Sequence, residues 1–242
     1  MSNKSNIIIV GSANYDLNAY CQNLPQIGET TLGNSSAMIV LNGLQKKFGR
    51  QHILQDITYT FETGSKTVVL GSNGSGKSTL IKIVSGALEA TEGAPSFTFD
   101  GKTIPAKSIG LHVGIAAPYV ALNPMFSLKE SLEFHTKFCP FPEGFKQAQW
   151  IEKAGLAQHN NKRLSTFSSG MLQRVRLLMA IANERPLLLL DEPLSNLDTD
   201  GVQWYKELIQ SFAPSKTVIV GSNYQKDEYS FCTNELLLEK HY

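Results

Sequence analysis

The sequence lacks an excess of charge of either sign. Its 22 lysines and arginines stand against 21 aspartates and glutamates in 242 residues, which gives a formal net charge of +1. Proteins that bind nucleic acid over a broad surface carry a clear positive excess, so no nucleic-acid partner is expected. The sequence also lacks an apolar run as long as a membrane span, and the apolar residues 7–10 are too few for the core of a secretory signal. A cytoplasmic protein is expected, and work at a membrane would need a separate spanning partner.

Cysteine is also scarce, with three residues that stand far apart at Cys21, Cys139 and Cys232. Their spacing matches no zinc-ligand pattern and no disulfide framework, so reduced thiols are expected. A hydrophobic content of 42% with 18% charged residues excludes a disordered chain. At this length the sequence supports one well-packed domain with room for a short appendage.

Strand and helix patterns alternate from residue 38 onward, which is typical of an α/β fold with a mostly parallel sheet covered by helices. Short apolar runs predict strands, and segments with a helical period predict helices. The predicted strands are residues 38–44, 57–61, 67–70, 110–117, 187–190, 217–220 and 235–239, and the predicted helices are residues 77–85, 128–138, 146–154, 169–183 and 199–212. The helical stretch at approximately 119–184 interrupts the alternation and predicts an inserted helical subdomain.

A glycine-rich segment follows the predicted strand 67–70 and opens the helix 77–85. It satisfies the phosphate-loop pattern G-x-x-x-x-G-K-[ST] with Gly71, Ser72, Asn73, Gly74, Ser75, Gly76, Lys77 and Ser78. Glycines allow backbone N–H groups to surround phosphates, and the start of a helix adds partial positive charge. The segment predicts an ATP site in which Lys77 contacts the β- and γ-phosphates, Ser78 binds Mg²⁺ and Thr79 holds a phosphate oxygen. The simpler alternative is a glycine-rich turn with an incidental lysine.

Two carboxylates end the strongly apolar strand predicted at 187–190. Asp191 fits the acidic residue that orients Mg²⁺ in phosphate-loop NTPases. Glu192 is placed to polarise an attacking water as a general base. Alone, four leucines and two acids would simply be a buried strand and its exit, but together with the glycine loop they predict an ATPase.

Further residues make the sequence resemble the ATP-binding cassettes of ABC transporters. Phe-Ser-Ser-Gly-Met at 167–171, followed by Leu-Gln-Arg-Val, is similar to the family signature Leu-Ser-Gly-Gly-Gln, from which Ser169 and Met171 depart. The segment 195–198 resembles the family's D-loop, and the aromatic residue before Gly49 resembles the one that stacks on adenine. The resemblance implies a phosphate-loop NTPase fold of ABC type, with nucleotide contacts from Phe48, Ser168, Ser169, Gly170 and Asp198.

Two positions depart further from the family pattern. Tyr119 takes the place of the Q-loop glutamine that contacts the metal, and its hydroxyl binds water better than it ligates Mg²⁺. Asn223 takes the place of the catalytic switch histidine, and it can contact a γ-phosphate only as a neutral group. Both changes bear on the rate of hydrolysis more than on nucleotide binding, so hydrolysis is expected to be slow.

Residues 1–37 do not follow this pattern and resemble a different family. Residues 7–10, the segment with Asn14 and Asp16, and Pro-Gln-Ile-Gly-Glu-Thr at 25–30 are similar to the start of ribokinase-family sugar kinases. No glycine-rich anion hole with a catalytic aspartate follows, so a working sugar kinase is not expected. The interpretation is a leader or fusion segment at 1–37 before an ABC nucleotide-binding domain at 38–242. A natural extension that docks on the cassette is the alternative.

The resemblance implies the ATP-binding and ATP-hydrolysing subunit of an ABC transporter. Two cassettes, of this chain or of a paralogue, would close head to tail on two ATP molecules, each between Lys77 of one copy and Ser168 of the other. They would drive a separate integral membrane permease from the inner face of the membrane, which the segment 118–127 would contact. The alternatives are a degenerate cassette that binds ATP with little hydrolysis and a non-transport ABC ATPase.

Overall fold

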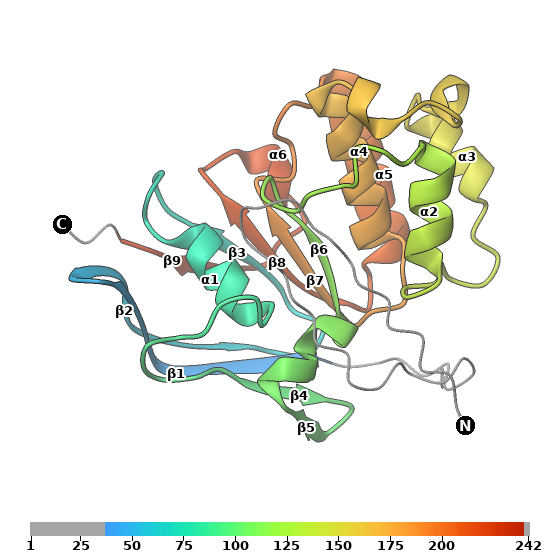
Figure 1. Cartoon of the computed structure of the whole chain (residues 1–242). Helices are drawn as coiled ribbons and strands as arrows, with labels where there is room; N and C mark the ends of the chain where they lie inside the picture. Colours follow the sequence, from blue (N-terminus) through green and yellow to red (C-terminus); the bar gives the residue numbers. More distant parts are fainter. Residues whose placement is uncertain (1–36, 240–242) are drawn as a thin grey trace, which may run out of the picture. The chain divides into compact units, whose positions relative to one another are not determined.

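A computed structural model describes residues 37–239 of the chain. Its centre is a five-stranded sheet in the order β6-β7-β8-β3-β9 (Figure 1). Every neighbouring pair in this sheet is parallel, which confirms the predicted α/β fold with a parallel core. The strands are β3 (Lys66–Leu70), β6 (Val113–Ala116), β7 (Leu187–Asp191), β8 (Thr217–Ser222) and β9 (Asn234–Leu237).

A second, antiparallel sheet lies beyond helix α1 (Lys77–Val84) (Figure 1). In the order β2-β1-β4-β5, it consists of β1 (Ala37–Phe48), β2 (Gln51–Phe61), β4 (Ser96–Phe99) and β5 (Lys102–Ile104). The predicted strands 38–44 and 57–61 belong to this sheet and not to the parallel one, because a two-residue turn folds β2 back onto β1. The β4–β5 hairpin was not predicted, since its strands are short and only half buried.

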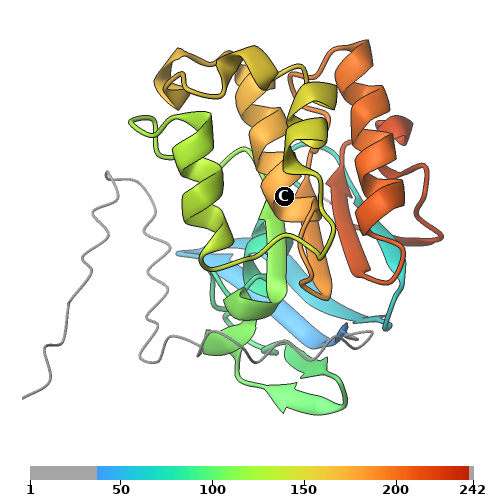
Figure 2. The ribbon, with the colours of Figure 1, turned by 90° about the vertical axis from the view of Figure 1, so that its right-hand side faces the viewer.

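The other side of the parallel sheet carries a layer of helices, which Figures 1 and 2 show grouped away from the antiparallel sheet. They are α2 (Leu128–Thr136), α3 (Gln147–Lys153), α4 (Ser169–Ile181) and α5 (Thr199–Phe212), and the short helix α6 (Lys226–Tyr229) follows β8. Three 3₁₀ turns complete the elements of residues 37–239, at Ala106–His112, Ala157–His159 and Leu164–Thr166. The first of these corrects the predicted strand 110–117, which begins only at Val113. None of the helices in the described part of the chain is long and apolar enough to span a membrane.

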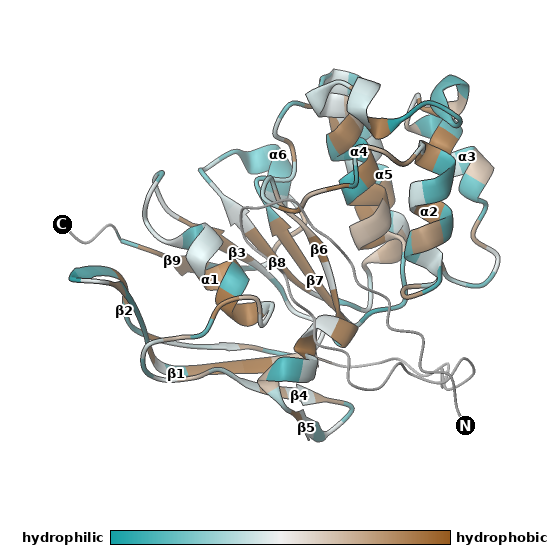
Figure 3. Ribbon diagram, viewed as in Figure 1, coloured by the Kyte–Doolittle hydropathy of each residue, from teal (hydrophilic) through white to brown (hydrophobic). Residues whose placement is uncertain are grey.

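Four of the parallel strands (β6, β7, β8 and β3) are largely buried, and their side chains divide between two cores, whereas the edge strand β9 is largely exposed. Leu188 and Leu190 of β7 pack in the core under α4 and α5. Leu187 and Leu189 of the same strand pack in the core with α1 and the antiparallel sheet. The continuous apolar runs of the sequence therefore reflect two covered faces, and Figure 3 shows β6 and β7 largely in the hydrophobic colour.

The first described residue already belongs to the fold. Ala37 is fully buried at the start of β1, one residue before the predicted domain boundary. Its carbonyl oxygen accepts a hydrogen bond of 2.6 Å from the hydroxyl of Thr217, which in turn accepts one of 2.9 Å from the N–H group of Gly64. The remainder of the predicted leader, residues 1–36, lies outside the described residues.

Candidate functional site

The parallel topology brings four predicted segments to one edge of the sheet. Tyr119 follows β6, Asp191 ends β7, Asn223 follows β8 and the loop from Gly71 follows β3. These four strands are consecutive neighbours in the order β6-β7-β8-β3. Since the carboxyl ends of parallel strands meet at one edge, where ligands of open α/β sheets bind, the arrangement forms a candidate nucleotide site.

The glycine loop is closed tightly on itself. Lys77 is only 5% exposed, and its Nζ donates hydrogen bonds to the carbonyl oxygens of Gly71 at 2.7 Å and Ser72 at 3.1 Å. Gly76 has a φ of 101°, and a Cβ there would lie 2.7 Å from Cδ2 of Leu54 on β2. Only glycine fits this conformation and this approach. The loop therefore presents backbone N–H groups and one ammonium at the start of α1, the arrangement that binds phosphate.

Asp191 has the surroundings expected of a cation ligand. It is 1% exposed, and neither carboxylate oxygen receives a hydrogen bond of normal geometry from residues 37–239. Burial raises the pKa of this carboxyl, and the hydroxyl of Ser78 partly offsets the rise. A Cβ on Gly221 of β8 would lie 2.9 Å from Oδ1 of Asp191 and 3.6 Å from Cβ of Lys77, so the acid lies beside the lysine.

These unsatisfied oxygens fit a hydrated Mg²⁺ ion. The buried hydroxyl of Ser75 also lacks a hydrogen-bond partner among the described residues. No cluster of three or more His, Cys, Asp or Glu side chains suited to a metal exists between residues 37 and 239. A cation here would take its other ligands from water and phosphate oxygens, as Mg²⁺ usually does in proteins.

Glu192 is held in a strained backbone conformation at the same edge. Its φ is 47°, and non-glycine residues keep such a conformation only where the surroundings fix it. Its N–H group donates to the carbonyl oxygen of Gly221 at 2.9 Å. The next residue, Pro193, accepts a hydrogen bond of 2.9 Å from Nε2 of the buried Gln173 on α4. Sequence reasoning missed Gln173 as a support of this loop, because a single glutamine within a helix gives no signal.

Tyr119 packs its ring against α1 and its hydroxyl faces a buried polar region. Nζ of Lys82 lies 4.2 Å from the ring centroid, within the range of a cation–π contact. The hydroxyl is buried and finds no hydrogen-bond partner in the described part of the chain. Burial raises the pKa of this phenol, and the charge of Asp191 raises it further. The tyrosine therefore presents a hydroxyl group within electrostatic reach of Asp191.

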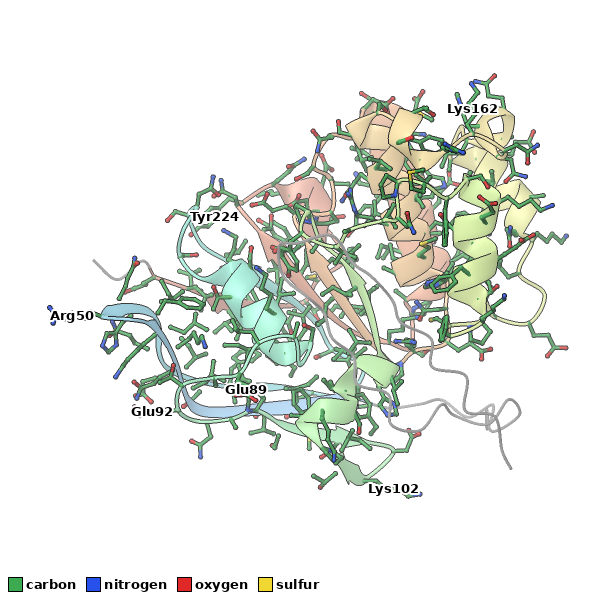
Figure 4. All side chains as sticks on the ribbon, viewed as in Figure 1. Arg50, Glu89, Glu92, Lys102, Lys162 and Tyr224 are labelled. Atoms are coloured by element: carbon green, nitrogen blue, oxygen red, sulfur yellow. The ribbon has the colours of Figure 1, made fainter. Side chains whose placement is uncertain are left out.

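Asn223 occupies an exposed, tightly closed turn after β8. The hydroxyl of Ser222 accepts a hydrogen bond of 3.2 Å from the N–H group of Gln225, which closes the turn around the two residues between them. Tyr224 has a φ of 61° and is 54% exposed, and Figure 4 shows its side chain at the outer edge of the molecule. Asn223 itself is exposed, so its amide is free to contact a ligand at this edge.

The predicted signature residues lie around the start of α4. The hydroxyl of Ser168 caps this helix by accepting a hydrogen bond of 3.2 Å from the N–H group of Met171. A Cβ on Gly170 would lie 2.6 Å from the carbonyl oxygen of Asn196, so the helix start packs directly on the segment 195–198. Asp198 caps α5 by accepting from the N–H group of Gly201 at 2.8 Å, and it also pairs with Arg174.

An open groove of about 560 Å³ lies at this helix start and is separate from the glycine loop. Its lining includes Ser168, Ser169, Gly170, Asn196 and Asp198 but none of residues 71–79. The structure thus brings the predicted residues together in two groups. One group surrounds the glycine loop, and the other surrounds the start of α4.

Phe48 lies on the β1–β2 hairpin and is 51% exposed. Nζ of Lys46 lies 4.9 Å from its ring centroid. The same hairpin contacts the glycine loop, since the β2 residues Ile53 and Leu54 pack around Gly76. An exposed aromatic ring on an element that touches a phosphate loop is suited to stack on a nucleobase.

Comparison with known proteins identifies similar chains. The profile of a family described as ABC transporter matches residues 54–195, more than half of the chain. An uncharacterized ABC transporter ATP-binding protein of Bacillus subtilis (strain 168), YybJ, is 33% identical over 197 residues, which cover 81% of this chain and 89% of that protein. The resemblance of residues 1–37 to sugar kinases finds no support in these comparisons.

Solved structures agree with this match. A bacterial ABC transporter cassette solved as a dimer has a TM-score of 0.70 at 23% identity, covering 83% of this chain and 94% of the other. A dimeric post-hydrolysis state of an ATP-binding cassette, bound to ADP and Pi, has a TM-score of 0.69 at 20% identity, covering 84% and 97% of the two chains. At these identities the likeness establishes the fold.

Proposed function

This chain belongs to the ABC transporter family as one of its ATP-binding subunits, and from that premise we propose that two cassettes close head to tail on two ATP molecules. The observation that supports this arrangement is the separation of the two site groups within one chain. Lys77 and Asp191 lie beside each other at the sheet edge, whereas Ser168 and Gly170 line a groove that includes none of the glycine loop. A second copy would bring its groove to the first copy's glycine loop. Each ATP would then lie between the glycine loop of one copy and the groove of the other.

Each group has a chemical task in this proposal. Lys77 and the loop N–H groups bind the phosphates, Ser78 and Asp191 hold the Mg²⁺ ion, and Phe48 stacks on the adenine. The ion would supply charge neutralisation at the transferred phosphoryl group. Glu192 orients and polarises the attacking water.

Three further residues act on the phosphate side of the site. Asn223 donates a neutral hydrogen bond toward the γ-phosphoryl oxygens, and Tyr119 donates one to a water near Asp191. Ser168 of the second cassette, at the positive end of α4, receives the γ-phosphate from the other side.

A partly exposed row of aromatic rings supports a separate membrane subunit as the partner. The rings of Phe126, Phe134 and Phe138 lie in a row. The ring centroids of Phe126 and Phe134 are 5.8 Å apart, and those of Phe134 and Phe138 are 5.2 Å apart. Met125 is 61% exposed, Phe134 42% and Phe138 50%, which is unusual for apolar side chains that have no partner. We assign this face, and the segment 118–127 before it, to a permease subunit, which would hold the protein at the cytoplasmic face of a membrane.

Tyr119 and Asn223 favour a second candidate, a cassette that binds ATP and hydrolyses it very slowly. Neither side chain provides the metal-binding amide or the cationic hydrogen bond of the usual family residues. The two candidates differ only in turnover, because both bind ATP and dimerise. A steady-state measurement of phosphate release by the purified chain separates them.

The primary test is nucleotide binding by Lys77→Ala. In the wild-type chain the ammonium exchanges two carbonyl partners for phosphate oxygens, and hydrogen bonds between charged groups contribute about 1.5–3 kcal/mol. A net loss of about 2–3 kcal/mol corresponds to an ATP affinity roughly 30- to 150-fold weaker. Titration with fluorescent ATP measures it, with Lys102→Ala on the exposed strand β5 as the matched control. An affinity of Lys77→Ala equal to that of the control would refute the assignment.

A further inference from the structure

A buried carboxylate behind the sheet edge has no role in the function proposed so far. Glu228 on the short helix α6 is 2% exposed. Its Oε2 accepts a hydrogen bond of 2.5 Å from the hydroxyl of Ser222, at the end of β8. Its Oε1 accepts one of 3.3 Å from the N–H group of Leu194, in the loop after β7. One side chain therefore joins two loops that emerge from neighbouring strands.

The first of these loops carries Asn223. The hydroxyl of Ser222 donates to Glu228 and accepts from the N–H group of Gln225 at 3.2 Å. This chain of hydrogen bonds fixes the turn that contains Asn223 and Tyr224. Since Ser222 directly precedes Asn223, displacement of Glu228 would remove the hydrogen bond that holds the start of this turn.

The second loop carries Glu192. Leu194 follows it by two residues, and its N–H group donates to Glu228, while Gln173 donates to the carbonyl oxygen of Pro193. The strained φ of 47° at Glu192 requires such support from the surrounding residues. The hydroxyl of Tyr205 on α5 donates a hydrogen bond of 2.8 Å to the backbone carbonyl of Glu228, a contact that anchors the helix and does not involve the carboxylate.

We propose that Glu228 is a positioning residue for ATP hydrolysis: its carboxylate sets Glu192 and Asn223 at a fixed separation across the γ-phosphoryl site. This inference rests on the proposed function and assigns to that site a residue outside every family motif of the sequence. Glu228 does not touch ATP. It acts only through the two loops, so its loss slows the chemical step and leaves nucleotide binding intact.

The electrostatics agree with a carboxyl close to the reacting groups. Burial raises the pKa of Glu228 to about 7, the hydrogen bonds from Ser222 and Leu194 oppose the rise, and the charges of Glu192 and Asp191 add to it. The two adjacent acids at the end of β7 therefore lie within electrostatic reach of Glu228. The hydrogen bonds keep it in place despite the cost of its burial.

The test compares the purified full chain with Glu228→Gln, Ser222→Ala and the double variant. The amide of Glu228→Gln keeps one acceptor oxygen and loses the other, whereas Ser222→Ala removes the hydroxyl donor. We expect each single variant to lower kcat about tenfold, equivalent to about 1.4 kcal/mol, with the Kd for ATP unchanged. The double variant should be no slower than the slower single variant, because both remove the same link.

Tyr205→Phe is the matched control for a purely structural effect. It removes the hydroxyl that holds the backbone of α6 and leaves both contacts of the carboxylate in place. We expect it to lower the Tm while kcat stays at the parent's value. A parent-like kcat in both single variants would overturn the proposal, as would a loss of kcat in Tyr205→Phe equal to that in Glu228→Gln. A parent chain that does not bind ATP would instead overturn the proposed function, and this inference with it.

Discussion

Replacement of Asn223 by histidine should accelerate hydrolysis. The residue is exposed, and the turn that contains it is closed by Ser222 and Gln225 rather than by its own side chain. An imidazole at this position therefore enters solvent at the sheet edge without displacing a packed group. The backbone of the turn, including the strained Tyr224, keeps its hydrogen bonds.

The size of the effect follows from the difference between two hydrogen bonds. Asn223 offers the γ-phosphoryl oxygens a neutral donor, which contributes about 0.5–1.5 kcal/mol, whereas a protonated histidine contributes about 1.5–3 kcal/mol. If the difference of about 1–2 kcal/mol is realised in the transition state, kcat rises roughly five- to thirtyfold. The gain should grow as the pH falls toward the ordinary histidine pKa of about 6.5, because only the imidazolium donates the stronger bond.

The assay is phosphate release at saturating Mg-ATP for the parent, Asn223→His and Gln225→His. The last variant introduces an imidazole two residues further along the same exposed turn and controls for a nonspecific effect of charge. Equal rates for the parent and Asn223→His at pH 6.5 would refute the electrostatic argument. An equal acceleration by Gln225→His would do so as well.

Three further results are expected. Glu192→Gln should abolish ATP turnover, because an amide cannot accept the proton of the attacking water. The variant should also leave an ATP-bound dimer that size-exclusion chromatography detects. A hydrolysis rate equal to the parent's would favour the candidate that binds ATP with very slow hydrolysis. A chain that begins at Met38 lacks the carbonyl of Ala37 that Thr217 binds, so its free energy of unfolding should be about 1 kcal/mol below that of a chain that begins at Ala37, as measured by urea denaturation. Burial lowers the pKa of His135 from 6.5 to about 4, with help from the charge of Arg185, so the unfolded chain binds a proton at a higher pH than the folded chain. The free energy of unfolding should therefore fall from pH 6.5 toward 4, by an amount on the order of 2 kcal/mol. In His135→Gln it should depend less on pH. Parallel curves of unfolding free energy against pH for the parent and the variant would contradict this prediction.

The parts of the site that the sequence predicts are those in which contacts are local. Asp191 ends one strand and Lys77 ends the short loop that follows another, and the alternation of strands and helices brings such strand ends to one edge. Asn223 and Tyr119 were located through the resemblance to the family, which puts each of them shortly after a predicted strand. In each case a short segment contains both the structural signal and the chemical group.

The parts that the sequence did not predict depend on contacts between distant segments. Glu228 binds the N–H group of a residue 34 positions away, and Gln173 binds a carbonyl 20 positions away. A lone polar residue in a helix gives no indication that it is buried or which loop it supports. The antiparallel sheet was missed for a similar reason, because Ala37 to Val40 pair with residues 96–99 across the intervening glycine loop and α1.

The division of the site between the glycine loop and the groove at α4 has a consequence for the kinetics of the whole assembly. If each reaction centre needs one half from each of two cassettes, specific activity should rise with protein concentration until association is complete. A copy with Lys77→Ala would still offer an intact groove at Ser168 to its neighbour. Mixed with the parent chain, it would form hybrid dimers with one working centre, and these would show whether the two centres hydrolyse ATP independently. A decline of activity in proportion to the fraction of altered copies means that they do. A steeper decline means that both centres must bind ATP before either hydrolyses it.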